Sequence, residues 1–291
     1  MKKVLILNNA YYELESYLYQ SKRLKEELEL LGAQVTVRKN NFFPCITDGK
    51  DIVNNCEGYD FCIYLDKDKY ISEMLEKSGL RVINSHKAMV TCDDKMVTYI
   101  ALSGSGIKTP KTMPGLLCYT KDAEIKQSTI DEIEKNLGYP IIVKKSFGSL
   151  GKGVYKADNR QELELISRSV MFEPHHYQEY ISESAGRDLR VIVIGGKFVC
   201  AMQRRSETDF RSNVELGGEG KIVDVPKEFI EVAENTAKVL NLDYCGIDLL
   251  YGKDCEPIVC EVNSNAFFGG IERVTGKNVA KAYAKYLLSK Y

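Results

Sequence analysis

Residues 144–156, KKSFGSLGKGVYK, form a glycine- and lysine-rich stretch whose flanks constrain the fold of this 291-residue chain more than any other segment. The preceding PIIVKK has an apolar strand pattern, and the following GVYKAD alternates as a strand does. A P-loop would need glycine at Ser146, serine or threonine at Gly153, and a helix behind it. The stretch is therefore predicted to be a loop between two strands, with backbone and lysine N–H groups that suit a phosphate.

The composition excludes several classes of function. Forty basic and forty-one acidic side chains give a formal charge of −1, which offers no general attraction for nucleic acid or an acidic membrane. The start, MKKVLILNNA, is too short an apolar stretch for a signal peptide, and no other stretch is apolar enough to cross a membrane. Nine cysteines without a Cys-x-x-Cys pair fit reduced thiols better than disulfides or zinc. We therefore expect a cytoplasmic protein without a nucleic-acid or membrane partner.

The first part of the chain has a β-α-β pattern. Apolar residues from Tyr17 to Leu31 recur at helical spacing. Strand patterns occur at 3–7, 34–37, 61–65 and 81–84. Together they predict a small Rossmann-like α/β domain over residues 1–88. Its first turn, Asn8-Asn9-Ala10, lacks the GxGxxG fingerprint, so no dinucleotide is expected there.

Beyond residue 88 the pattern becomes α+β. Thr91 and Asp94 have the spacing of an N-terminal helix cap, with MVTYIAL as the helix body. A central unit over residues 89–185 would hold the glycine-rich loop. After Gly186 two strand–turn–strand patterns, each followed by a helical pattern, predict a third unit over residues 186–291.

Three oxygen-bearing side chains are predicted to converge near the C-terminus. Glu261 and Asn263 are two residues apart on a strand and so share a face. If the hairpin turns about Asp254-Cys255, Asp248 lies opposite Glu261. Such oxygens suit magnesium, which takes one or two carboxylates together with phosphate oxygens. A polar surface facing solvent is the alternative, although the apolar neighbours of both carboxylates argue against it.

Further polar side chains are candidates for a binding site. Lys144 ends an apolar strand, where its ammonium could reach a phosphate, and a surface lysine is the alternative. Lys95 and Asp188 are similar cases. His175 and His176 could act as ligand or base, but a solvated approach to a strand is the simpler interpretation.

A series of motifs resembles one known family. In chain order they are VKKSFGSLGKGV, QEYI, GRDLRVIVIGGK, DFRSNVELGG, GIDLL and CEVNSN. This order resembles the ATP-grasp fold preceded by a Rossmann-like pre-ATP-grasp domain. DFRSN followed by Gly217-Gly218 is similar to the RimK-type branch of ligases, which includes the LysX group. The resemblance runs from about Asp94 to the C-terminus, and the first domain shares only its α/β character.

The resemblance implies a role for each candidate residue. Those implied to bind ATP, with the glycine-rich loop closing as a flap, are Lys95, Lys144, Gly148, Ser149, Gly151, Gly153, Glu179, Tyr180, Ile181 and Asp188. Two Mg²⁺ ions, with Mn²⁺ as an alternative, would be held by Asp248, Glu261 and Asn263. The groups implied to face the γ-phosphate and the acyl phosphate made from it are Arg190, Arg204, Arg211 and Asn213. Arg211 is expected to project into the site because its apolar neighbour Phe210 points to the opposite face.

The resemblance also implies an activity. Ligases of this type join a carboxylate to an amine through an acyl phosphate, so we expect an amino acid to be added to a small-molecule or peptide carboxylate. The alternative is a non-catalytic ATP-binding regulator of the same fold. Residues 264–268, SNAFF, differ from the Ser-Ser-Pro-Gly of glutamate ligases, and RRSETDFRSN looks one residue shorter, so glutamate is not implied as a substrate. A homo-oligomer is compatible with the sequence.

Overall fold

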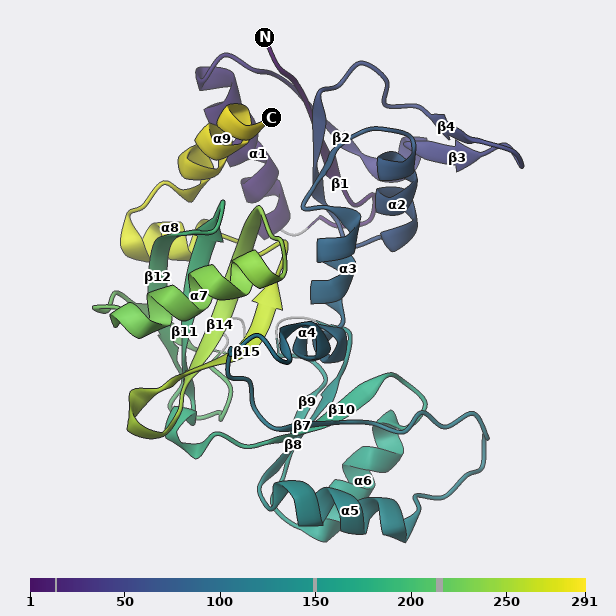
Figure 1. Cartoon of the computed structure of the whole chain (residues 1–291), viewed down its shortest axis with the longest axis vertical. Coiled ribbons are helices and arrows are strands. Elements are labelled where there is room, and N and C mark those ends of the chain that lie inside the picture. Colours follow the sequence, from purple (N-terminus) through teal and green to yellow (C-terminus); the bar gives the residue numbers. More distant parts are fainter. Residues whose placement is uncertain (14, 149–150, 213–216) are drawn as a thin grey trace.

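The described residues form three sheets of four or five strands, with helices on their faces, and a separate two-stranded sheet (Figure 1). The structure, a computed structural model, describes residues 1–13, 15–148, 151–212 and 217–291. The strands are β1 (Lys3–Asn8), β2 (Gln34–Lys39), β3 (Cys45–Thr47), β4 (Ile52–Asn54), β5 (Phe61–Leu65), β6 (Val82–Ile83), β7 (Thr112–Pro114), β8 (Ile141–Lys145), β9 (Val154–Ala157), β10 (His175–Glu179), β11 (Arg187–Ile194), β12 (Lys197–Arg205), β13 (Glu219–Lys221), β14 (Tyr244–Tyr251) and β15 (Pro257–Asn263). The helices are α1 (Glu15–Leu30), α2 (Lys69–Lys77), α3 (His86–Asp93), α4 (Lys95–Leu102), α5 (Gln127–Leu137), α6 (Arg160–Val170), α7 (Lys227–Val239), α8 (Gly269–Thr275) and α9 (Val279–Lys290).

The N-terminal sheet is parallel, with strand order β2-β1-β5-β6. β1 is apolar at successive positions because both of its faces are covered. Val4 and Ile6 pack with α1, whereas Leu5 and Leu7 pack on the opposite face with α2. The strand order reverses between β1 and β5, and the crevice at the carboxyl ends of such strands is where open α/β sheets bind ligands.

The central sheet is antiparallel, with order β7-β10-β8-β9. Ile141 and Val143 of β8 pack against α5 and α6. Because side chains alternate along a strand, Ile142 and Lys144 project from the other face. As predicted, the glycine-rich loop joins two antiparallel strands, β8 and β9.

The C-terminal sheet, β13-β12-β11-β14-β15, is also antiparallel and has a core on each face. Leu189, Val191 and Val193 of β11 pack against α7. Ile192 and Ile194 face the other way and join one core with α8, α9 and the N-terminal sheet. The N-terminal sheet and the C-terminal sheet therefore share a hydrophobic core.

The side chain of Asn84 links these two sheets through hydrogen bonds of both its amide nitrogen and its amide oxygen. Its amide nitrogen donates to the carbonyl oxygens of Tyr244 (2.8 Å) and Ser264 (2.6 Å). Its amide oxygen accepts from the backbone N–H groups of Asp243 (2.8 Å) and Tyr244 (3.1 Å). The side chain is buried, so losing it would leave four backbone groups without partners.

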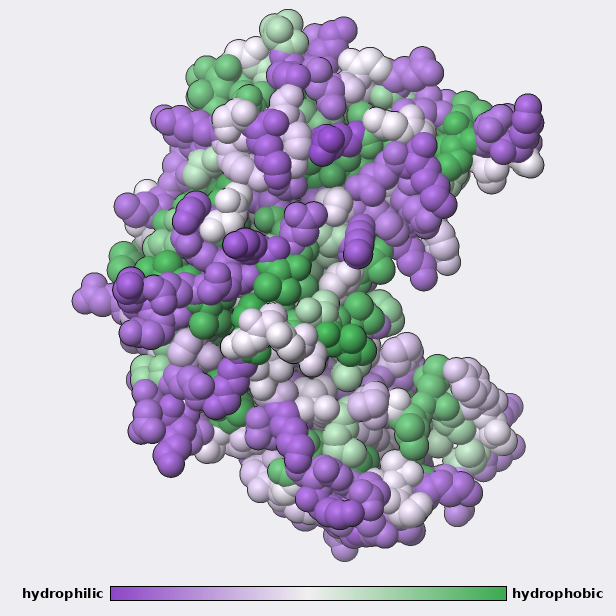
Figure 2. Space-filling view, viewed as in Figure 1, coloured by the Kyte–Doolittle hydropathy of each residue, from purple (hydrophilic) through white to green (hydrophobic). Residues whose placement is uncertain are grey.

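The outer surface is divided into lobes. In Figure 2 a notch on one side separates the lobe that carries α2 and the β3–β4 hairpin from the lobe that carries α5 and α6. No helix of the described residues is long and apolar enough to span a membrane.

Two local predictions are wrong. Thr91 does not cap a helix but lies inside α3, and Asp94 itself caps α4 by accepting from the N–H groups of Met96 and Val97. His175 and His176 are not solvated, since both lie within β10 and are buried. In each case the tertiary packing, absent from the local pattern, decides the outcome.

Candidate active site

A row of charged side chains crosses the C-terminal sheet. Arg190 of β11 lies opposite Asp248 of β14, which lies opposite Glu261 of β15, as predicted for the two carboxylates. The turn between β14 and β15 is not centred between Asp254 and Cys255 as predicted. Tyr251 pairs with Pro257, which places the centre of the turn at Asp254. A bulge at Cys260 makes up the difference of one residue and restores the predicted pair.

Two arginines neutralise Asp248. Arg190 binds it through Nε and through Nη2 (2.7 Å to Oδ2), and Arg204 approaches the same carboxylate at 2.9 Å. Arg204 also binds Asp188, with Nε 2.7 Å from Oδ1. Burial raises the pKa of Asp248, but Arg190 and Arg204 outweigh it and hold that pKa below its ordinary value. The result is a buried chain of alternating charges.

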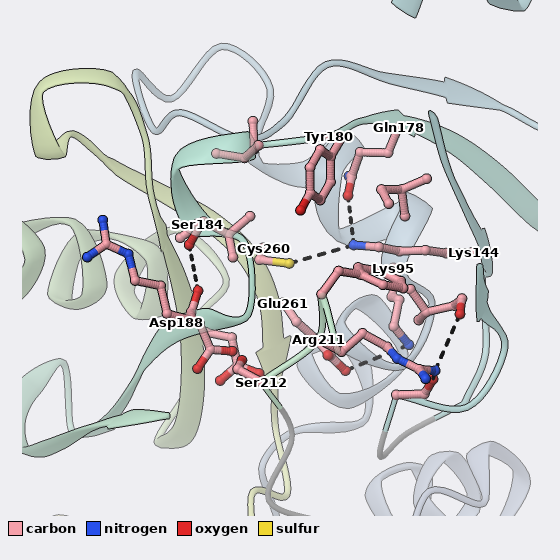
Figure 3. A pocket seen from close by; sticks show the side chains of 18 of the residues that line it. Lys95, Lys144, Gln178, Tyr180, Ser184, Asp188, Arg211, Ser212, Cys260 and Glu261 are labelled. Carbon is pink, nitrogen blue, oxygen red and sulfur yellow. Dashed lines mark hydrogen bonds and ion pairs between the residues drawn. The ribbon is translucent and has the colours of Figure 1, made fainter. Parts of the chain in front are cut away.

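Lys144 is a buried cation on the facing sheet. Its Nζ donates to Gln178 Oε1 at 2.7 Å and lies 3.6 Å from Cys260 Sγ (Figure 3). Burial alone lowers the pKa of Lys144, yet nearby Cys260, Tyr99 and Glu261 raise it above its ordinary value. Lys144 therefore stays charged, with no carboxylate in hydrogen-bond contact among the described residues.

The glycine-rich loop is held across the site by two cations. Lys95 Nζ donates to the carbonyl oxygen of Gly148 (2.8 Å) and lies 3.7 Å from Glu261 Oε1. Arg211 Nη1 donates to the carbonyl oxygen of Gly151 (2.8 Å), while its Nη2 pairs with Asp209 (2.7 Å). Lys95 and Arg211 are thus both bound to backbone carbonyl oxygens of the glycine-rich loop.

A first cavity, of about 110 Å³, lies between the central and C-terminal sheets (Figure 3). The predicted site residues that line it are Lys95, Lys144, Gly148, Gly151, Glu179, Tyr180, Ile181, Asp188, Arg204, Arg211, Asp248 and Glu261. Gly153 is not among the lining residues, and its φ of +75° at the start of β9 is one that side chains disfavour. Ser149 and Asn213 lie outside the described residues.

A second cavity, of about 490 Å³, lies between the C-terminal sheet and the N-terminal part of the chain. Arg190 and Asn263 line this cavity rather than the first. Arg204 and Glu261 line both. The two cavities therefore meet at the charged row that contains Asp248.

The expected orientation of Phe210 is wrong, although Arg211 does reach the first cavity. Phe210 lines the same cavity and packs edge-on against Tyr180, with ring centroids 6.4 Å apart. The alternation assumed for a strand does not apply, because residues 206–212 form no strand in the structure.

Some site residues were not predicted. Gln178 could have been found, because it stands two residues before Tyr180 and shares the face of β10 that neighbours Lys144. Cys260 could not, since its position depends on the bulge. His176 is buried behind Lys144, and neither of its ring nitrogens has a partner among the described residues. Burial, followed by the charges of Lys144 and Lys95, lowers the pKa of His176 to about 3.

Comparison with known proteins gives the family. Residues 92–287 match the RimK-like ATP-grasp domain. The chain belongs to this family. A relative of similar length, the probable alpha-L-glutamate ligase of Psychromonas ingrahamii, is 33% identical over 286 residues, which cover 93% of this chain and 91% of that protein.

Longer relatives and solved structures extend the comparison. Beta-citrylglutamate synthase B of Danio rerio is 36% identical over 227 residues, covering 77% of this chain but 54% of that protein. The aligned region thus spans little more than half of that relative. The ATP-grasp ligase PsnB, solved with a phosphomimetic variant of its minimal precursor, Mg and ADP, superposes with a TM-score of 0.69 at 17% identity and covers 99% of this chain and 98% of that one. The predicted ATP-grasp fold is confirmed.

Proposed function

We propose that this protein is an ATP-dependent carboxylate–amine ligase that forms an amide bond through an acyl phosphate and releases ADP and phosphate. The observation that carries this proposal is the meeting of the two cavities at Glu261 and Arg204, beside Asp248. A ligase needs one chamber for a nucleotide and another for the groups to be joined. The shared charged row is where a phosphoryl group would pass between them.

The first cavity is the proposed nucleotide site. Tyr180 and Ile181 would flank the base, and Glu179 and Asp188 would read polar groups of the nucleoside. Lys95 and Lys144 would bind phosphates, because both ammonium groups lie along the cavity and neither is bonded to a carboxylate at short range. The loop that contains Gly148 and Gly151 would open to admit ATP, and Gly153 would permit its return into β9.

Asp248, Glu261 and Asn263 are the proposed magnesium ligands. They fit the ion because they offer two adjacent carboxylates and an amide oxygen, and phosphate oxygens complete such sites. No group of three or more His, Cys, Asp or Glu side chains suited to a metal occurs in the described part of the chain. Bound magnesium, as one or two ions, would neutralise charge on the transferred phosphoryl group. Arg190 and Arg204 would then be free to turn from Asp248 towards the phosphate.

The chemistry requires charge neutralisation more than covalent help. A substrate carboxylate oxygen attacks the γ-phosphorus and the bond to ADP breaks, which gives an acyl phosphate. An amine nitrogen then attacks the acyl carbon, phosphate leaves with the C–O electrons, and the nitrogen loses its proton to solvent. Arg190, Arg204, Arg211 and Asn213 are proposed to stabilise the charge that develops on phosphate oxygens.

The names of the relatives support a ligase. A glutamate ligase and a synthase of a glutamate conjugate are among them, and the PsnB complex contains Mg and ADP. We propose an amino acid as the amine substrate and a small molecule or peptide as the acid. We further propose the division into residues 1–88, 89–185 and 186–291, and a cytoplasmic location.

The test is ADP release with product mass analysis. Purified protein is incubated with ATP, Mg²⁺ and pairs drawn from a panel of carboxylic acids, amino acids and short peptides. We expect ADP to form only when a suitable acid is present and an amide product to need both partners. Tight ATP binding without ADP release across the whole panel would overturn the proposal and favour the non-catalytic regulator.

A further inference from the structure

The second cavity has an aromatic wall built from opposite ends of the chain. Phe267, in the stretch that differs from glutamate ligases, packs edge-on against Tyr17 of α1, with ring centroids 4.6 Å apart. Tyr12 lies behind this wall and does not line the cavity; its ring centroid is 4.3 Å from that of Tyr17. Figure 1 shows that α1, which carries Tyr17, and α8, which follows Phe267, lie together despite their distance in sequence.

Phe267 is held in place by its neighbours. Phe268 is fully buried in the core that the N-terminal and C-terminal sheets share. The carbonyl oxygen of Ala266 accepts from Tyr244 Oη (2.7 Å) and from Gln20 Nε2 (3.4 Å). Because both flanking residues are fixed, the ring of Phe267 is presented to the cavity as a rigid apolar surface.

The charges on the two sides of the cavity differ. On the N-terminal side, Lys67 is paired with Asp93 at 2.7 Å, and Asp66 precedes it. Glu15 also lines this side, and burial, followed by Tyr12, Asp66 and Asp93, raises the pKa of Tyr17 to about 12. This side therefore offers no spare positive charge for an acidic group.

Arg273 of α8 supplies the cation on the other side. It lines the cavity and is exposed, and no hydrogen bond or ion pair joins it to any residue within the described ranges. Its neighbour Glu272 is already engaged, accepting from Tyr19 Oη (2.7 Å) and from the backbone of Ala280 (3.0 Å). A guanidinium in this position can bind one carboxylate through two parallel hydrogen bonds.

We propose that the second cavity binds the amine substrate as an α-amino acid with an apolar side chain, whose carboxylate pairs with Arg273 and whose side chain packs on the Tyr17–Phe267 wall. This inference rests on the proposed ligase function and adds the substrate class. The amino group would then point towards Glu261 and Arg204, where the acyl phosphate forms. An acidic side chain such as that of glutamate would meet the negative N-terminal side and bind poorly.

Calorimetric titration tests the inference without turnover. The probes are L-leucine, L-phenylalanine, L-glutamate and L-leucinamide, added to the full chain with Mg²⁺ and a non-hydrolysable ATP analogue. Leucine or phenylalanine should bind at least about tenfold more tightly than glutamate, and leucine about ten- to a hundredfold more tightly than leucinamide, which lacks the carboxylate. Equal or tighter binding of glutamate, equal binding of leucinamide, or no binding of any probe would overturn the inference.

Two variants locate the contacts. Phe267→Ala should weaken leucine about tenfold, and Arg273→Gln should remove the difference between leucine and leucinamide. Phe172→Ala and Arg168→Gln, which alter a half-exposed Phe and the last-turn Arg of α6 outside both cavities, should change neither affinity. Unchanged leucine affinity in both cavity variants would place the amino acid elsewhere.

The ligation assay separates this inference from the function on which it rests. Binding as expected but no ADP release with any acid would uphold the inference about the cavity and sink the ligase proposal. ADP release with glutamate as the preferred amine, unaffected by Phe267→Ala, would sink the inference and leave the ligase proposal standing.

Discussion

The two cavities on either side of Glu261 are built on different principles. The first is lined by paired charges and by a glycine-rich loop, and most of its residues lie in short sequence motifs. The second is lined by aromatic side chains and by three arginines, Arg190, Arg204 and Arg273, from segments far apart in the sequence. The comparison teaches that the nucleotide side of this protein is built mostly from short sequence motifs, whereas the proposed substrate side is built largely from residues outside those motifs, such as Tyr17, Phe267 and Arg273.

The largest effect is expected from removing Glu261, one of the two residues that line both cavities. Glu261→Ala should lower kcat/KM for ligation by about a thousandfold, or about 4 kcal/mol, because phosphate charge would go uncompensated. Glu256→Ala, which alters a half-exposed glutamate on the same hairpin, is the matched control. Near-normal turnover of Glu261→Ala at ordinary Mg²⁺ concentration would mean that the cavities do not meet at a metal site.

A second variant tests whether Arg211, which contacts the glycine-rich loop, also contributes to ligation. Arg211→Lys should keep ATP affinity within about threefold but lower ligation by roughly one to three orders of magnitude, since an ammonium cannot reproduce the paired hydrogen bonds of a guanidinium. The control is Arg205→Lys, an exposed arginine on β12. Normal ligation, or loss of ATP binding, would show that Arg211 has another role.

A third prediction concerns the pH dependence of protein stability. His176 is buried next to Lys144 of the first cavity, and its ring nitrogens have no hydrogen-bond partner among the described residues. His176 has a folded-state pKa of about 3, so the unfolded chain binds a proton there below about pH 6.5 while the folded chain does not. Stability is therefore lost as the pH falls through this window, by about 2 kcal/mol between pH 6.5 and 5. Urea unfolding of His176→Met should show a shallower loss of stability than the wild type over this pH range. Parallel pH profiles would contradict the assignment of His176.

The smallest expected effect concerns the bulge residue. Cys260→Ala should change KM for ATP by less than about threefold, because a thiol is a weak hydrogen-bond partner and Lys144 retains Gln178. Gln178→Met should raise that KM by about tenfold, since it removes the oxygen that accepts a 2.7 Å hydrogen bond from Lys144. A larger effect from Cys260 than from Gln178 would reverse the order of the two contacts.

How much the sequence predicts depends on whether local spacing or distant packing places a residue. Alternation along strands predicted that Asp248 and Glu261 face each other. They do so because the bulge at Cys260 offsets a one-residue difference between the predicted and observed pairing near the turn. The same reasoning failed for Phe210, because residues 206–212 are not a strand. It also failed for His175 and His176, whose burial depends on elements more than ten residues away. For Phe267 the sequence shows only that its stretch differs from the pattern of glutamate ligases. The contact with Tyr17 could not be predicted, because Tyr17 lies 250 positions earlier in the sequence.

The shared core and the Asn84 contacts have a consequence for engineering. An obvious way to change the substrate of a proposed ligase of this kind is to exchange residues 1–88 between relatives. Here that graft would cut through a core in which β1, α1, α8 and α9 pack as one body, and it would separate Asn84 from the backbone of residues 243, 244 and 264. The natural unit of recombination is therefore discontinuous: a chimaera would carry residues 264–291 together with the N-terminal segment, and would still need Asn84 for its contacts with the backbone of residues 243 and 244.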